Sequence, residues 1–149
     1  MFAIRLFALL GLAICLVGCA ADDGQFTLPK GDAERGQEAF VKFRCFDCHL
    51  VHGVNLPPGE EPGQVMVQLG GQVDRLREYG DLVTAIINPS HRLAKGYSDN
   101  MVANDGKSRM TVYNDVMTVT QLIDIVTFLQ LHYELRPYEP TPYPDYYGP

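Results

Sequence analysis

Cysteine is scarce in this chain, and its distribution excludes two kinds of site. The 149 residues contain four cysteines, Cys15, Cys19, Cys45 and Cys48. A secreted domain held together by disulfides needs several pairs at scattered positions, whereas only Cys45 and Cys48 lie in the body of this chain. A structural zinc site needs four ligands, usually supplied as two pairs, and no second Cys/His pair is present. We therefore expect neither a disulfide framework nor a structural zinc site.

Positive charge is also low. Lysine and arginine total 12 against 18 aspartates and glutamates, which gives a formal net charge of −6. A protein that binds nucleic acid needs a basic surface to neutralise phosphates. The composition therefore argues against nucleic acid as a partner and favours partner proteins with a neutral or basic docking surface.

The apolar run at the N-terminus is too short to span a membrane. Leu6–Gly18 has about 13 residues, fewer than the roughly 20 that a membrane-spanning helix needs. It follows Arg5 and precedes small residues, which is the pattern of a secretory signal. Its end, Leu16-Val17-Gly18-Cys19, resembles a bacterial lipobox, in which the peptide is cut before a cysteine that then carries lipids. We predict a signal peptide at residues 1–18 and lipidation of Cys19.

A lipidated Cys19 predicts a periplasm-facing protein that is anchored to the membrane of the cell envelope. Several acyl chains on one residue hold a protein more firmly than a single chain, whose binding is marginal. Ala20 after the cysteine favours the outer membrane over the inner one. The alternative is ordinary cleavage after Ala21, which would give a soluble periplasmic protein.

The sequence has no segment with the alternating pattern of a strand, and three segments have helical spacing instead. They are residues 31–44 with Asp32 as N-cap, residues 81–88 with Asp81 as N-cap, and the segment that follows Thr118 and ends before Pro137. Thr118 and Gln121 match a capping box. These patterns predict an all-α fold.

The remaining segments define the domain organisation. We predict a polar tether at residues 19–30, one domain at 31–136 and an extended tail rich in proline and tyrosine at 137–149. Residues 53–63, rich in proline and glycine, and the aperiodic residues 90–109 predict long irregular loops. Because the helices have too little apolar periodicity for a self-sufficient core, we expect a cofactor to fill the middle of the domain.

The string Cys45-Phe46-Asp47-Cys48-His49 indicates what that cofactor is. A thioredoxin-like pair follows a strand in a βαβ unit, whereas this one ends a predicted helix among other helices. Two thiols at i and i+3 can reach two vinyl groups on one edge of a porphyrin, and the next histidine is then directed at the iron. C-x-x-C-H is the attachment pattern of c-type haem for this reason. We predict one covalent haem c on Cys45 and Cys48, with His49 as an iron ligand.

The ligand on the opposite face of the iron is less clear from the residues alone. Met, His or no residue can occupy that position. The chain offers four methionines beyond the signal peptide and one histidine in a loop, namely Met66, Met101, Met110, Met117 and His91. Tyr79, Tyr97 and Tyr113 are expected to pack in the haem pocket or in the core.

Over residues 30–135 the chain resembles the class I c-type cytochromes of bacteria. The resemblance includes Gly36 and Phe40 of the first predicted helix, the string CFDCH, the segment LVTAIINPSHRLAKGY at 82–97, and MTVYNDVMTVTQLIDIVTFLQ at 110–130. It implies a cytochrome c fold, with about three main helices around one haem. It also implies that the first and last helices cross, with Gly36 and Phe40 against Ile125 and Phe128.

The resemblance also assigns roles to residues. Met110 becomes the sixth ligand, although Thr111 stands where many relatives have proline. The second ring nitrogen of His49 is expected to donate to a backbone carbonyl near a proline, here Pro57, Pro58 or Pro62. The implied function is single-electron transfer to redox partner proteins by a monohaem cytochrome, not an enzymatic reaction.

Two other functions remain open from the sequence. One is a haem sensor or gas-binding module in which the sixth ligand is labile or absent. The other is a cytochrome subunit of a larger redox enzyme complex, docked through residues 137–149.

Overall fold

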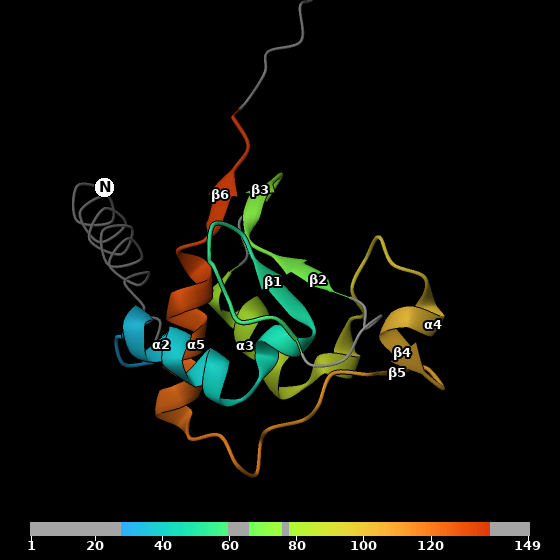
Figure 1. Cartoon of the computed structure of the whole chain (residues 1–149), viewed down its shortest axis with the longest axis horizontal. Helices are drawn as coiled ribbons and strands as arrows, with labels where there is room; N and C mark the ends of the chain where they lie inside the picture. The colour runs from blue at the N-terminus through green and yellow to red at the C-terminus, as the bar shows by residue number, and fades with distance from the viewer. Residues whose placement is uncertain (1–27, 60–65, 76–77, 138–149) are drawn as a thin grey trace, which may run out of the picture.

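The computed structural model describes residues 28–59, 66–75 and 78–137 (Figure 1). The predicted signal peptide, Cys19, most of the tether and residues 138–149 of the predicted tail lie outside these ranges. Within the described ranges, no helix combines the length and the apolar character that crossing a membrane requires.

The first described helix, α2, spans Ala33–Lys42 and begins where the sequence predicts. Its N-cap is Asp32, whose side chain accepts the backbone N–H of Arg35 at 3.0 Å, so one of the unpaired donors of the first turn is satisfied. Beyond the helix, Arg44 has a left-handed backbone conformation with φ of 57°. That turn ends α2 and leads directly into the short 3₁₀ helix η1, Cys45–Asp47.

The last helix, α5, spans Val119–Gln130. The predicted capping box is confirmed: Thr118 Oγ1 accepts the N–H of Gln121 at 3.2 Å, and the Gln121 side chain accepts the N–H of Thr118 at 3.0 Å. The helix is shorter than the sequence predicts, because the chain turns at Leu131 and continues as strand β6, Tyr133–Leu135.

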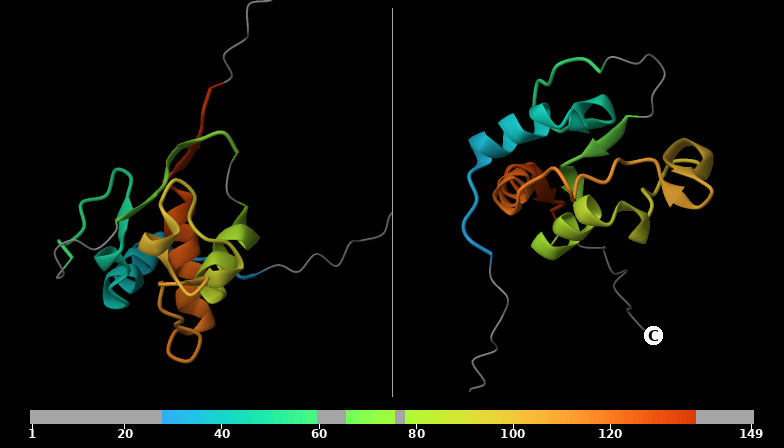
Figure 2. Two further views of the ribbon diagram at one scale, coloured as in Figure 1. Left: turned by 90° about the vertical axis from the view of Figure 1, so that its right-hand side faces the viewer. Right: turned by 90° about the horizontal axis from the view of Figure 1, so that it is seen from below.

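Helices α2 and α5 lie against each other and form the centre of the core (Figures 1 and 2). The expected crossing at Gly36 is confirmed, since a Cβ at this position would collide with the Asp124 carbonyl group and with Cβ of Phe128. The rings of Phe40 and Phe128 meet edge to face with their centroids 5.7 Å apart. Phe40 and Val126, which are almost fully buried, belong to the core at this crossing.

The middle of the chain contains two more helices. Helix α3, Tyr79–Ile87, packs against α5 and begins two residues before the predicted Asp81, with Glu78 at the N-cap position. Its C-cap is Asn88, directly before Pro89, as expected, and the 3₁₀ helix η2, Pro89–His91, follows. The segment predicted as a loop also contains helix α4, Asp99–Val102.

The predicted fold, an all-α cytochrome c fold with about three main helices, is wrong: the described residues contain four α-helices and also strands. The described residues form six short strands in three two-stranded sheets. Strand β1, His49–Val51, pairs in parallel with β2, Val67–Leu69; β3, Gly71–Val73, pairs in parallel with β6; and β4, Ala103–Asn104, pairs antiparallel with β5, Lys107–Ser108. Each strand has only two or three residues, which is too short to show the alternating pattern that identifies a strand in a sequence.

Candidate cofactor-binding site

The string CFDCH lies in the connection between α2 and strand β1. Cys45 is the first residue of η1, Cys48 follows its last residue, and His49 is the first residue of β1. The turn is held by Arg44, whose Nε donates to Oδ2 of Asp47 at 2.8 Å. Both cysteines are half-buried, and Cys45 packs against the apolar core.

Strand β2 holds the second half of this string through one residue, Val67. The backbone N–H of Val67 donates to the carbonyl oxygen of Cys48 at 2.8 Å. The carbonyl oxygen of Val67 lies 3.3 Å from Nδ1 of His49. The two groups of a single residue therefore bond to neighbouring members of the string, which follows from the register His49↔Val67 of the parallel pair.

The bond to Val67 defines the tautomer of His49. Because a carbonyl oxygen only accepts hydrogen bonds, Nδ1 carries the proton and the lone pair of Nε2 remains available for a metal ion. This is the second-sphere arrangement usual for metal-binding histidines. The acceptor comes from β2, so the expectation of a carbonyl near Pro57 or Pro58 is wrong; Pro62 lies outside the described residues.

Burial keeps the His49 ring neutral. It lowers the pKa of His49 below its ordinary value, and the hydrogen bond to Val67 opposes this effect in part. A neutral imidazole is the form that binds a metal ion.

The electrostatics of Cys45 disfavour thiol–disulfide chemistry. Burial raises the pKa of Cys45 to about 11, and negative charge at Cys48 and Asp47 adds to the rise. Redox-active cysteines have lowered pKa values because the thiolate is the nucleophile.

No group of three or more His, Cys, Asp or Glu side chains in the described residues could hold a metal ion.

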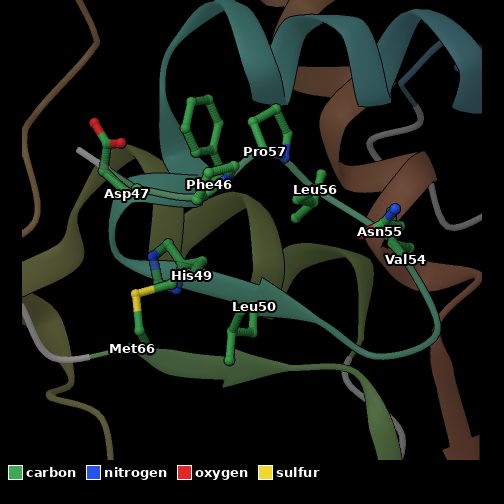
Figure 3. A pocket seen from close by; sticks show the side chains of 11 residues that line it. Phe46, Asp47, His49, Leu50, Val54, Asn55, Leu56, Pro57 and Met66 are labelled. Carbon is green, nitrogen blue, oxygen red and sulfur yellow. The ribbon is translucent and has the colours of Figure 1, made fainter.

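A cavity of about 380 Å³ opens on one side of His49 (Figure 3). Its lining includes Leu56, Pro57 and Met66, and the Met66 side chain points toward the His49 ring. Cys45, Cys48 and Met110 do not line it. The sequence offers Met66 as one methionine among four; its position becomes visible only through the pairing of β2 with β1, which brings it to the side of the histidine.

Met110 lies in the loop between β5 and α5, half-buried against the same apolar core as Cys45. Tyr113, three residues later, ties this loop to the end of α2. Its hydroxyl donates to the carbonyl oxygen of Phe43 at 2.9 Å, and the two rings lie 5.5 Å apart. Burial raises the pKa of Tyr113, and negative charge at Cys45 and Cys48 adds to the rise. The loop that contains Met110 and Tyr113 therefore lies close to Cys45 and Cys48.

The other candidate ligands differ in exposure. Met101, on α4, is 44% exposed, and His91 is exposed, with Nδ1 3.1 Å from the carbonyl oxygen of Asn88. Met117 is half-buried against the core, and its N–H donates to the carbonyl oxygen of Tyr113 at 2.8 Å. Met110 and Met117 are thus the candidates that pack against the core, whereas Met66 lies beside His49 at the cavity.

Comparison of the chain with protein-family models, with curated proteins and with solved structures gave no match.

Proposed function

We propose that this chain carries single electrons as a monohaem c-type cytochrome, with the haem held by Cys45 and Cys48. The observation that supports this most directly is the β2 residue Val67, which bonds to Cys48 through its N–H and to His49 through its carbonyl oxygen. Two of the three residues that c-type attachment requires, Cys48 and His49, are therefore held by one strand pair, and Cys45 begins the 3₁₀ turn that precedes it. The proposal does not depend on an all-α fold.

The donor set of the site fits the cofactor. Two half-buried thiols three residues apart would form the thioether links, and His49 would offer Nε2 as an iron ligand, because its Nδ1 bonds to Val67. Met110 is the proposed sixth ligand, because it packs against the core. Its loop is held beside Cys45 by the hydrogen bond from Tyr113 to the carbonyl oxygen of Phe43. When bound, the haem would supply a metal centre that changes oxidation state by one electron.

The two proposed ligands, His49 and Met110, would determine the reactivity and the reduction potential of this centre. If His49 and Met110 both bound the iron, no position would remain open for a substrate or a gas, which favours electron transfer. A thioether ligand stabilises the reduced iron and raises the reduction potential relative to a second histidine. The half-burial of His49 and Met110 would limit the contact of this centre with water.

The proposal includes a location and partners. The lipobox-like end of the signal sequence supports a periplasm-facing protein anchored through Cys19, preferably to the outer membrane. The excess of acidic residues supports redox partner proteins whose docking surfaces are neutral or basic.

Optical spectra of the full chain, produced where c-type haem is attached, test the function and the sixth ligand together. We expect haem that stays bound after denaturation and a weak red charge-transfer band in the ferric protein. The band should disappear in Met110→Ala and persist in Met101→Ala, the matched control at an exposed methionine.

Three results would contradict the proposal. A chain without covalently bound haem would remove its basis. A wild-type spectrum that is high-spin or reacts with carbon monoxide would favour the sensor function instead. Loss of the band in Met117→Ala but not in Met110→Ala would contradict the assignment of Met110 and identify Met117 as the sixth ligand.

A further inference from the structure

We infer that Tyr97 is a positioning residue for His49, because its hydroxyl holds the strand whose carbonyl accepts the Nδ1 proton of the histidine. This inference rests on the proposed function, in which His49 is the iron ligand. Tyr97 belongs to the segment between η2 and α4 and is 29 residues from Gln68, so only the fold brings it to β2.

The Tyr97 hydroxyl bonds to both neighbours of Val67. It accepts the backbone N–H of Gln68 at 3.1 Å and donates to the carbonyl oxygen of Met66 at 3.4 Å. One hydroxyl group therefore holds the peptide groups on either side of the residue that bonds to His49.

The pairing pattern of β2 explains why these two groups need a partner. In a parallel pair, alternate residues of a strand direct their N–H and C=O groups to the same neighbour. Val67 directs both of its groups to β1, so the N–H of Gln68 and the carbonyl of Met66 face the opposite edge. The β1–β2 sheet has two strands, and Tyr97 replaces the missing third strand at this edge.

The contact affects the ligand because the bond from His49 to Val67 is long, at 3.3 Å. Hydrogen bonding at the second nitrogen of a ligating histidine makes the ring a better electron donor and fixes its orientation. If β2 moves away by a few tenths of an ångström, that bond weakens. His49 would then be a weaker electron donor to a bound iron, and the reduction potential would move to more positive values.

Tyr97→Phe tests this with the loss of one oxygen atom, and Tyr79→Phe is the matched control. The Tyr79 hydroxyl is buried and has no hydrogen-bond partner among the described residues, so its removal breaks no bond. Both variants are made in the haem-loaded full chain. The first measurement is solvent exchange of the His49 Nδ1 proton by NMR, and the second is the reduction potential.

We expect the Nδ1 proton to exchange roughly fivefold faster in Tyr97→Phe, since one hydrogen bond contributes about a factor of five to an equilibrium. The potential should move to more positive values in the same variant, and both quantities should be unchanged in Tyr79→Phe. Equal exchange rates and equal potentials in the two variants would overturn the inference.

The same experiment separates this inference from the proposed function. A wild-type chain without covalent haem contradicts the function, but His49 and Val67 can still be compared in that chain. Faster Nδ1 exchange in Tyr97→Phe than in Tyr79→Phe then supports the positioning role, and equal exchange overturns it.

Discussion

At the scale of single residues, Asp124 is the charged side chain that the fold buries, with 3% of its surface exposed among the described residues. It accepts the backbone N–H of Asp32 at 2.7 Å and Nε of Arg35 at 3.0 Å. A buried carboxylate is tolerated only when its oxygens are paired in this way. These bonds join the start of α2 to the middle of α5, so the residue links the two ends of the domain.

The Asp124 carboxylate makes stability depend on acid pH. The hydrogen bond from Arg35 and then the N–H of Asp32 lower its pKa below the ordinary value of 3.8. The unfolded state therefore binds a proton more readily than the folded state, and the stabilisation is present above about pH 4 and lost as the pH falls through the lower, folded-state pKa. Urea unfolding of the wild type between pH 2 and pH 7 should show this decline.

Asp124→Asn supplies the comparison. The amide keeps the shape but loses the charge, and we expect the free energy of unfolding at pH 7 to fall by about 1.5–3 kcal/mol, the range for hydrogen bonds to charged groups. The difference between variant and wild type should shrink at acid pH. A constant difference across the whole pH range would show that Asp124 does not titrate as described.

At the scale of the elements, the crossing of α2 and α5 determines the architecture. It works because Gly36 leaves room for the backbone of α5, and because Phe40 and Phe128 fill the space beside it. Gly31 makes a second close approach, since a Cβ there would collide with Thr127 Oγ1. Two glycines on one side of the contact let the helix axes come closer than ordinary side chains allow.

Gly36→Ala should therefore separate the helices, even though alanine is the better helix former. Its Cβ would meet the backbone carbonyl group of Asp124, which cannot rotate away as a side chain can. We expect a loss of stability of about 1–3 kcal/mol or more, as for other overpacked cores. Gly80→Ala in α3 is the control, because a Cβ there has no heavy atom within 4 Å; it should leave the unfolding midpoint unchanged or slightly raised. Equal unfolding midpoints for the two variants would show that α2 and α5 have room for a Cβ at position 36, which contradicts the close contact of the two helices.

The three longer helices were predictable from the sequence, whereas the strands and the four-residue helix α4 were not, for a physical reason. Asp32 and the Thr118–Gln121 pair signal helix starts through local contacts that the sequence displays directly. A strand of three residues such as β2 is defined by its partner, and the partner of Val67 is His49, 18 residues away. The candidate site divides in the same way: the string CFDCH was visible in the sequence, whereas Val67, Tyr97 and the position of Met66 depend on strand pairing.

At the scale of the whole molecule, the acidic balance governs encounters with partners. The formal net charge is −6, and Arg5 would leave with a cleaved signal peptide. Attraction between opposite charges accelerates association, and salt screens it. Under the proposed function, charge therefore affects the rate of electron exchange more than its driving force.

Stopped-flow oxidation and reduction by small reagents of different charge can measure this effect. We expect the rate with a positively charged reagent to fall severalfold between about 0.01 M and about 0.15 M salt, over which the Debye length shortens from about 30 Å to about 8 Å. The rate with a negatively charged reagent should rise, and that with a neutral reagent should stay constant. The same salt dependence for all three reagents would contradict steering by the protein's charge.

The pairing of α2 with α5 also has a consequence for the order of events during synthesis. Asp32 and Asp124 are 92 residues apart, and ribosomes add about 5–20 residues per second from the N-terminus. Residues 45–49 are therefore made, and under the proposed export also translocated, before α5 is available to close the core. We expect the two thiols to remain open to chemical attachment for as long as α5 is missing, and to become protected once the last helix packs.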